Sequence, residues 1–194
     1  MINLEKYTYS RDLISTFIEK KLKKKLMNDQ KECKITSEGD LQSCVYYHIR
    51  KFIKQKKIVN WYVLNKLSMG KIKDSKKFPD IAIVRMKEKG KVKPIFLIEL
   101  KEDKKFKPKR VKNDIKKLSD LVKKNKKLEQ TFFIYAVLDE KLTQKEIEDE
   151  ITNLKRDPND RWMIPIAINM MGEKQFPKHS KNYMEKIDKL RKVR

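Results

Sequence analysis

The sequence predicts an α/β domain in which helices flank a mixed β-sheet. Some segments place apolar residues at helical spacing, whereas others are short runs of β-branched and aromatic residues, in the order α-α-β-β-β-α-β-α-β. A length of 194 residues favours one domain with terminal additions. We therefore expect an N-terminal helical extension packed on the core over residues 1–36, a core over 37–170 and a basic C-terminal tail over 171–194.

Two amphipathic helices come first in this order. The first is predicted over about Ser10–Met27, and the second begins near Ser37 and ends near Lys56. Ser37 is a favourable N-cap, and Asp40 lies three residues later, as in a capping box. Asp40 is therefore expected to belong to the cap of the second helix.

Three strands are predicted next, at Ile58–Leu67, Asp80–Met86 and Pro94–Leu100. The segment Glu88–Lys91 is suited to a hairpin turn between the second and the third. The third strand is almost wholly apolar, which predicts a central position buried on both faces.

A basic helix over about Pro108–Lys127 is expected after these strands, and an acidic-leaning helix over Leu142–Leu154 separates strands at Thr131–Leu138 and Trp162–Asn169. Pro165 cannot donate to a neighbouring strand, which predicts an edge or a bulge there. The basic residues expected on the outer faces of the basic helix are Lys109, Arg110, Lys112, Lys116, Lys117, Lys123 and Lys124.

The charge of the chain is strongly positive. Lysine and arginine number 50 against 27 acidic residues, giving a formal net charge of +23. Such a field attracts polyanions, and nucleic acid is the expected partner. The alternative is a lysine-rich proteome in which lysine simply fills exposed helix positions.

The N-terminal residues, the apolar runs and the cysteines predict a cytoplasmic protein with no membrane contact. The first residues show no apolar signal core, and no apolar run approaches the ~20 residues that span a bilayer. Cys33 and Cys44 fit neither a disulfide framework nor a paired zinc site, so free thiols in a reducing compartment are expected.

An acidic residue two positions before a lysine has little meaning by itself in this chain, where the spacing occurs nine times. Glu99 and Lys101 differ from the others in context, because they follow the apolar run of the third strand. Alternation places both side chains on one face, with Leu100 on the other. A carboxylate there is costly unless it is paired or bound to a metal.

Asp80 is the expected partner of Glu99. It begins the preceding strand and belongs to the only Pro-Asp dipeptide in the chain. If the two strands form a hairpin, Asp80 and Glu99 converge at one edge of the sheet. Two carboxylates and the Leu100 carbonyl offer hard oxygen ligands for Mg²⁺ or Mn²⁺. Lys101 beside them can orient or activate water and stabilise charge on a phosphate.

The residues Phe78-Pro79-Asp80 and Ile98-Glu99-Leu100-Lys101 resemble the motif of the PD-(D/E)xK, or restriction-endonuclease-like, nuclease superfamily. The resemblance covers about Ser37 to Leu138. It implies a three-layer α/β/α fold with core order αβββαβ and metal-dependent hydrolysis of phosphodiester bonds. It also implies that Asp80 and Glu99 are metal ligands and that Lys101 is the catalytic lysine.

Members of this superfamily often add a glutamate from the helix before the sheet, which implies a catalytic and metal-ligating role for Glu38. At 100° per residue, Glu38 lies near the stripe of apolar residues on that helix, whereas Asp40 lies nearly opposite. The alternative for Glu38 is a favourable charge at a helix N-terminus. Gln42 shares the face of Glu38 and is expected to support the site from behind the ligands.

The leading hypothesis is a Mg²⁺- or Mn²⁺-dependent nuclease acting on DNA, with RNA left open. One alternative is a non-catalytic nucleic-acid-binding or assembly protein on the same fold, and another is a basic RNA-associated protein. Many members of the superfamily dimerise, so a homodimer stays open, although the sequence shows no interface signal. The residues expected to contact the nucleic-acid backbone, or else to form an ordinary solvated surface, are Lys104, Lys105, Lys107, Lys109 and Arg110.

Overall fold

The computed structural model describes residues 4–32, 34–65, 79–87, 92–124, 128, 130–137, 139, 141–154 and 163–169. Four features predicted from the sequence lie outside these residues. They are Cys33, Phe78, the hairpin turn at Glu88–Lys91 and the tail over residues 171–194.

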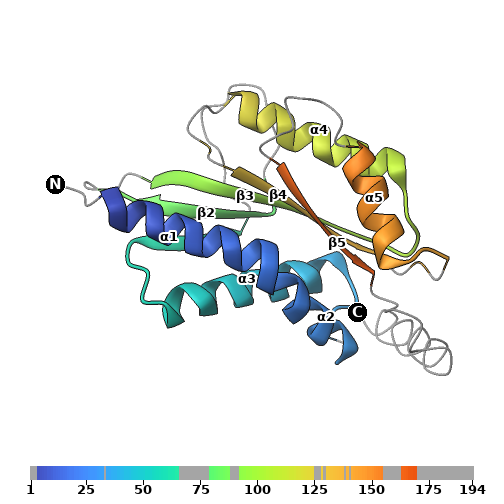
Figure 1. The fold of residues 1–194 in the computed structure, drawn as a ribbon, viewed down its shortest axis with the longest axis horizontal. Helices are drawn as coiled ribbons and strands as arrows, with labels where there is room; N and C mark the ends of the chain where they lie inside the picture. Colours follow the sequence, from blue (N-terminus) through green and yellow to red (C-terminus); the bar gives the residue numbers. More distant parts are fainter. Residues whose placement is uncertain are drawn as a thin grey trace.

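A five-stranded mixed sheet forms the centre of the described structure, with strand order β1-β2-β3-β4-β5 (Figure 1). The pairs β1–β2 and β2–β3 are antiparallel, whereas β3–β4 and β4–β5 are parallel. The predicted α/β class with a mixed sheet is therefore confirmed. The bounds of the strands are Trp61–Asn65, Ile81–Met86, Val92–Asp103, Gln130–Val137 and Met163–Asn169.

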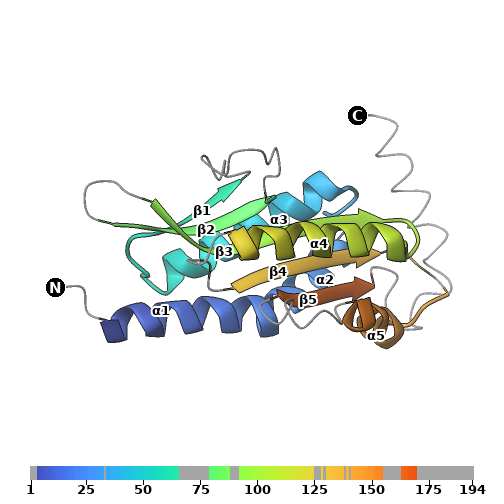
Figure 2. The ribbon, with the colours of Figure 1, turned by 90° about the horizontal axis from the view of Figure 1, so that it is seen from above.

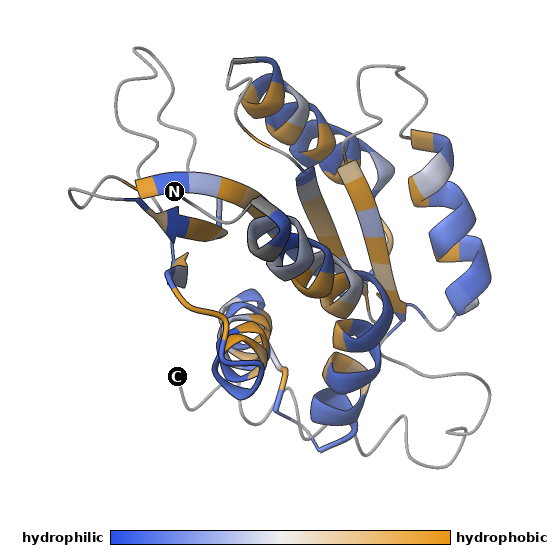
Figure 3. Cartoon of the chain, turned by 60° about the vertical axis from the view of Figure 1, so that its left-hand side comes forward, coloured by the Kyte–Doolittle hydropathy of each residue, from blue (hydrophilic) through white to orange (hydrophobic). Residues whose placement is uncertain are grey.

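Helices cover both faces of this sheet. One face packs against α3 (Glu38–Gln55) and the N-terminal helical segment, and the other packs against α4 (Pro108–Lys124) and α5 (Gln144–Leu154). Each interface forms its own hydrophobic core, because successive residues of a buried strand point to opposite faces. The helices mix hydrophobic and hydrophilic residues (Figure 3), as expected for elements with one buried face.

The N-terminal helical segment consists of α1 (Leu4–Thr16), a π-helical stretch η1 (Phe17–Leu22) and α2 (Lys23–Lys31). It begins earlier and ends later than the predicted Ser10–Met27. The apolar stripe that predicted the helix consists of Leu13, Ile14, Phe17, Ile18 and Leu22, so it did not reveal the turns before Ser10 or after Met27. Among the described helices, none is long and apolar enough to cross a lipid bilayer.

The predicted cap of α3 is confirmed. Ser37 has extended backbone angles, and its hydroxyl accepts a hydrogen bond from the Asp40 backbone N–H at 3.2 Å. The Asp40 carboxylate in turn accepts hydrogen bonds from the Thr36 backbone N–H, the Thr36 hydroxyl and the Ser37 hydroxyl. This network fixes the first turn of α3 and with it the position of Glu38.

The central strand β3 is longer than predicted. The apolar pattern ends at Leu100, but parallel pairing with β4 continues to Asp103, which lies opposite Val137. The other neighbour, β2, pairs with β3 only as far as Ile81 opposite Ile98. The hairpin pairing of β2 and β3 is confirmed, and so is the edge position of the strand that contains Pro165.

After β3 the chain turns back, and α4 runs along the sheet in the direction opposite to β3 and β4 (Figure 2). This reversal brings the middle of α4 over the middle of β3. Residues of α4 therefore face the same part of β3 that contains Glu99 and Lys101.

Candidate functional site

Asp80 lies where the pairing of β2 with β3 ends. Its side-chain Oδ2 accepts a hydrogen bond from the Leu100 backbone N–H at 2.8 Å, two residues past the last paired residue of β3. Gln42 of α3 donates from Nε2 to the backbone carbonyl of Asp80 at 2.8 Å. The structure thus brings Asp80, Leu100 and Gln42 together.

The Leu100 carbonyl points toward the side of β3 on which Asp80 lies. On an extended strand, the N–H and C=O of one residue point to the same side. Because the Leu100 N–H reaches Asp80, its carbonyl oxygen faces that side too. Two oxygen donors, from Asp80 and Leu100, therefore belong to one edge of β3.

Glu99 is the buried carboxylate of the site. It points toward α4 and is only 5% exposed, and its Oε1 forms an ion pair with Lys117. Its second oxygen, Oε2, is buried without a hydrogen-bond partner among the described residues. Burial and the neighbouring charge of Asp80 raise the pKa of Glu99 to about 7, although Lys117 opposes this shift.

Lys101 lies two residues further along β3 and pairs with Glu38 at the start of α3. Its Nζ is 2.5 Å from Glu38 Oε2. Burial by itself lowers the pKa of Lys101, but the hydrogen bond and charge of Glu38 outweigh burial, and the pKa is raised above its usual value. Lys101 is therefore an ammonium cation at neutral pH.

The helix α4 adds two residues that the sequence prediction missed. Lys117 does not lie on the outer face as predicted, because its side chain is 22% exposed and turned to Glu99. Asp114 is half-buried, and burial raises its pKa, with Lys101 and Lys117 opposing and Glu38 adding to the shift.

A signal for Asp114 was present in the helical spacing of α4. At 100° per residue, Asp114 lies between Leu118 and Leu121 on the apolar stripe. Lys117 lies about 40° beyond Leu121, at the border of the stripe. A lysine at such a border can turn either way, so spacing alone does not place it.

The site has a charge opposite to that of the whole chain. Glu38, Asp80, Glu99 and Asp114 face Lys101 and Lys117, whose charges appear in the pKa shifts of their neighbours. When all of these groups are ionised, the acids outnumber the lysines, within a chain of net charge +23. Such a local excess of acid suits a bound cation.

A metal fits only part of the predicted ligand set. Within the described part of the chain, no three His, Cys, Asp or Glu side chains form a ready-made metal site. Glu38 is held by Lys101, so it joins the other two carboxylates only if that ion pair opens. Asp80, the free oxygen of Glu99 and the Leu100 carbonyl are nevertheless hard oxygen donors of the kind that Mg²⁺ and Mn²⁺ prefer.

The basic residues after β3 divide into two groups. Lys104, Lys105 and Lys109 are exposed. Lys107 and Arg110 are exposed too, but they pair with Asp103, whose side chain is 3% exposed, and this contact fixes the start of α4.

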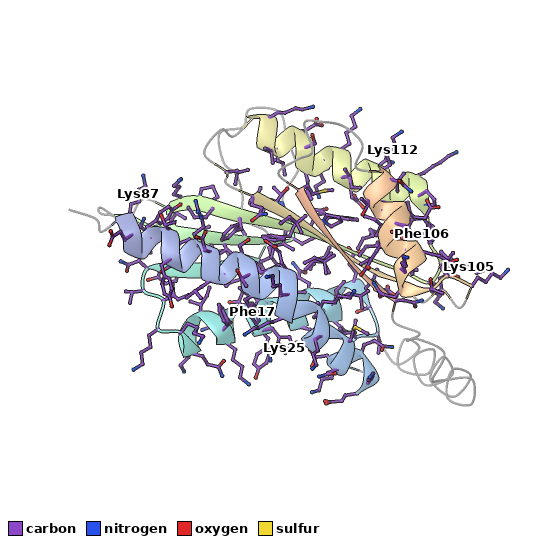
Figure 4. All side chains as sticks on the ribbon, viewed as in Figure 1. Phe17, Lys25, Lys87, Lys105, Phe106 and Lys112 are labelled. Carbon is purple, nitrogen blue, oxygen red and sulfur yellow. The ribbon has the colours of Figure 1, made fainter. Side chains whose placement is uncertain are left out.

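Two of the labelled lysines show the direction of this basic surface. Lys105 and Lys112 point away from the sheet (Figure 4).

No family model matches the chain, and no curated protein matches it significantly.

Proposed function

We propose that the chain is a metal-dependent nuclease that hydrolyses phosphodiester bonds, with DNA as its substrate. One observation carries the proposal. The buried Glu99 carboxylate has one oxygen without a partner among the described residues, and it lies near Asp80, just past the point where the pairing of β2 with the central strand ends. An unpaired buried carboxylate oxygen is costly, so a cation at this position would offset the cost.

The elements around the site support a restriction-endonuclease-like core as part of this proposal. The described order α3-β1-β2-β3-α4-β4 is compatible with an αβββαβ core, and β3 lies between an antiparallel and a parallel neighbour. The motif residues Pro79-Asp80 directly precede β2, and Glu99-Leu100-Lys101 lie on the adjacent strand β3.

In the proposed site, Asp80, Glu99 and the Leu100 carbonyl hold the cation. When bound, Mg²⁺ or Mn²⁺ supplies Lewis-acid polarisation of the phosphate and of a coordinated water. Lys101 contributes a positive charge and not a base, because Glu38 keeps it protonated. It stabilises the negative charge that develops on the phosphate during attack by water.

The rest of the molecule supports a nucleic-acid substrate. Exposed Lys105 and Lys109 follow β3 directly and can contact the phosphate backbone, which supplies affinity without sequence choice. We place the activity in the cytoplasm, where the free Cys44 thiol stays reduced.

Cleavage assays test the site directly. The purified protein is incubated with duplex, single-stranded and branched DNA in Mg²⁺, Mn²⁺ or EDTA. We expect cleavage only with metal, and a loss of about 100-fold or more in Asp80→Asn and Lys101→Met, because each removes a charge at the reacting phosphate or its cation. Asp149→Asn and Lys25→Met make the same charge changes at exposed positions and should cleave normally.

Metal-dependent cleavage that persists in Asp80→Asn and Lys101→Met would contradict the assignment of the catalytic site. Cleavage in EDTA would contradict the metal requirement. The two outcomes separate a wrong site from a wrong mechanism.

A second candidate is a non-catalytic nucleic-acid-binding protein on the same fold. The ion pairs Glu38–Lys101 and Glu99–Lys117 favour it, because each of these carboxylates is already paired with a lysine ammonium. This candidate predicts tight, salt-sensitive DNA binding and no cleavage with any divalent metal. It also predicts that Asp80→Asn leaves DNA affinity unchanged.

A further inference from the structure

Lys117 occupies an unusual place for a lysine on α4. Its neighbours Lys116 and Lys112 are exposed, whereas the Lys117 side chain is 22% exposed and reaches Glu99 on the strand below. A lysine usually extends its ammonium into water, so an inward ammonium needs a partner that offsets desolvation.

The two carboxylate oxygens of Glu99 have different surroundings because of this ion pair. Oε1 accepts from Lys117, while Oε2 is buried and has no partner among the described residues. Lys101 does not perform this task, because its ammonium is engaged by Glu38 at the start of α3. Lys117 is thus the cation that fixes how the Glu99 carboxylate is oriented.

We propose that Lys117 is a positioning residue that holds Glu99 Oε1 so that Oε2 is presented to the metal, an inference that rests on the proposed nuclease function. Carboxylates that bind metals are themselves held by hydrogen bonds from residues behind them. Without the Lys117 ammonium, the Glu99 side chain is free to rotate and the oxygen needed by the cation has no fixed direction.

The opposite role is physically distinct and makes the inverse prediction. If Lys117 only competed with the metal for Glu99, removing its charge would free a ligand and remove a repulsive cation. Metal affinity would then rise. The sign of the change in affinity therefore decides between positioning and competition.

Calorimetric titration of the metal-free protein with Mn²⁺, without DNA, measures this sign. We expect Lys117→Met to weaken Mn²⁺ binding about 10- to 100-fold, the usual effect of removing a residue that holds a ligand. Lys117→Arg retains a positive donor and should have a smaller effect. Lys116→Met, on the preceding and exposed residue, should bind Mn²⁺ like the wild type.

A double-mutant cycle shows whether Lys117 acts through Glu99. In a Glu99→Gln background, adding Lys117→Met should change Mn²⁺ affinity less than about twofold, because the carboxylate that Lys117 is proposed to hold is no longer there. This pair leaves neither the buried carboxylate nor its ammonium, so it also serves if Lys117→Met alone fails to fold. A further large decrease in this background would show that Lys117 does not act through Glu99, and would overturn the inference.

The result also distinguishes this inference from the proposed function. Wild-type protein that binds Mn²⁺ while Lys117→Met binds it equally or more tightly overturns the positioning role and leaves the nuclease proposal standing. Wild-type protein that neither binds Mn²⁺ nor cleaves DNA overturns both.

Discussion

Glu99 shows how burial and charge compete at a single residue. Lys117 stabilises its ionised form, but burial and the nearby Asp80 destabilise that form more, which leaves the pKa near 7. The carboxylate is therefore partly protonated at neutral pH in the absence of a metal. A divalent cation would shift this balance toward the ionised form.

Replacing Glu99 by glutamine should change how stability depends on pH. The folded-state pKa of about 7 lies above the ordinary 4.5, so folding favours the protonated form. The protonated form of Glu99 therefore contributes its full stabilisation below about pH 4.5, and this stabilisation is lost as the pH rises through 7. In EDTA, the free energy of unfolding of the wild type should fall by up to about 3 kcal/mol relative to that of Glu99→Gln between these pH values.

Urea unfolding at pH 4.5, 6 and 8 measures this difference. Glu150→Gln, an exposed position on α5, is the matched control and should follow the wild type. A constant gap between Glu99→Gln and the wild type over the whole range would contradict the raised pKa.

At the residue scale, the expected hairpin was sufficient to predict that Asp80 lies near Glu99, because strand pairing fixes which residues become neighbours. Helical spacing likewise directed Glu38 toward the sheet, where it contacts Lys101. The inward position of Lys117 was not predictable in this way. Its direction depends on a buried partner on another element, and a local pattern does not contain that information.

At the scale of elements, α3 depends on a cap that fixes both its start and the position of Glu38. Local sequence was enough to predict this cap, since the hydrogen bonds join residues at most four positions apart. The extension of β3 to Asp103 could not be predicted from side chains. It depends on backbone hydrogen bonds with β4, which form whether or not the side chains are apolar.

Ser37→Ala should lower the free energy of unfolding by about 1 kcal/mol, because the Asp40 backbone N–H loses its acceptor. Chemical denaturation measures the decrease. Ser43→Ala removes a hydroxyl from the exposed side of the same helix and should change stability by less than about 0.5 kcal/mol. Equal effects of the two substitutions would show that the cap contributes no special stability.

At the scale of the whole molecule, charge is distributed unevenly. The exposed residues after β3 and along α4 are lysine-rich, whereas the exposed residues of α5 include Glu146, Asp149 and Glu150. Net charge alone predicted a polyanion partner but not which face would bind it. That choice depends on the packing of α4 on β3, which leaves Lys109, Lys112, Lys116 and Lys123 exposed.

The salt dependence of DNA binding tests whether this surface is used. Lys105→Gln with Lys109→Gln should reduce the slope of log affinity against log salt by about 2, because each lysine neutralises one phosphate of the DNA. Lys24→Gln with Lys25→Gln removes the same charge from exposed positions on α2. If both double variants reduce the slope equally, the attraction comes from net charge and not from the surface after β3.

The contacts of the N-terminal helical segment have a consequence for synthesis on the ribosome. Ser15 donates a hydrogen bond to Gln130, and Lys23 pairs with Glu148, across 115 and 125 positions of sequence. These contacts with β4 and α5 can therefore form only after most of the chain has been made, although α3, which also packs against the segment, is made soon after it. During translation the side of the segment that meets β4 and α5 stays uncovered, which makes it a natural client for chaperones that bind nascent chains.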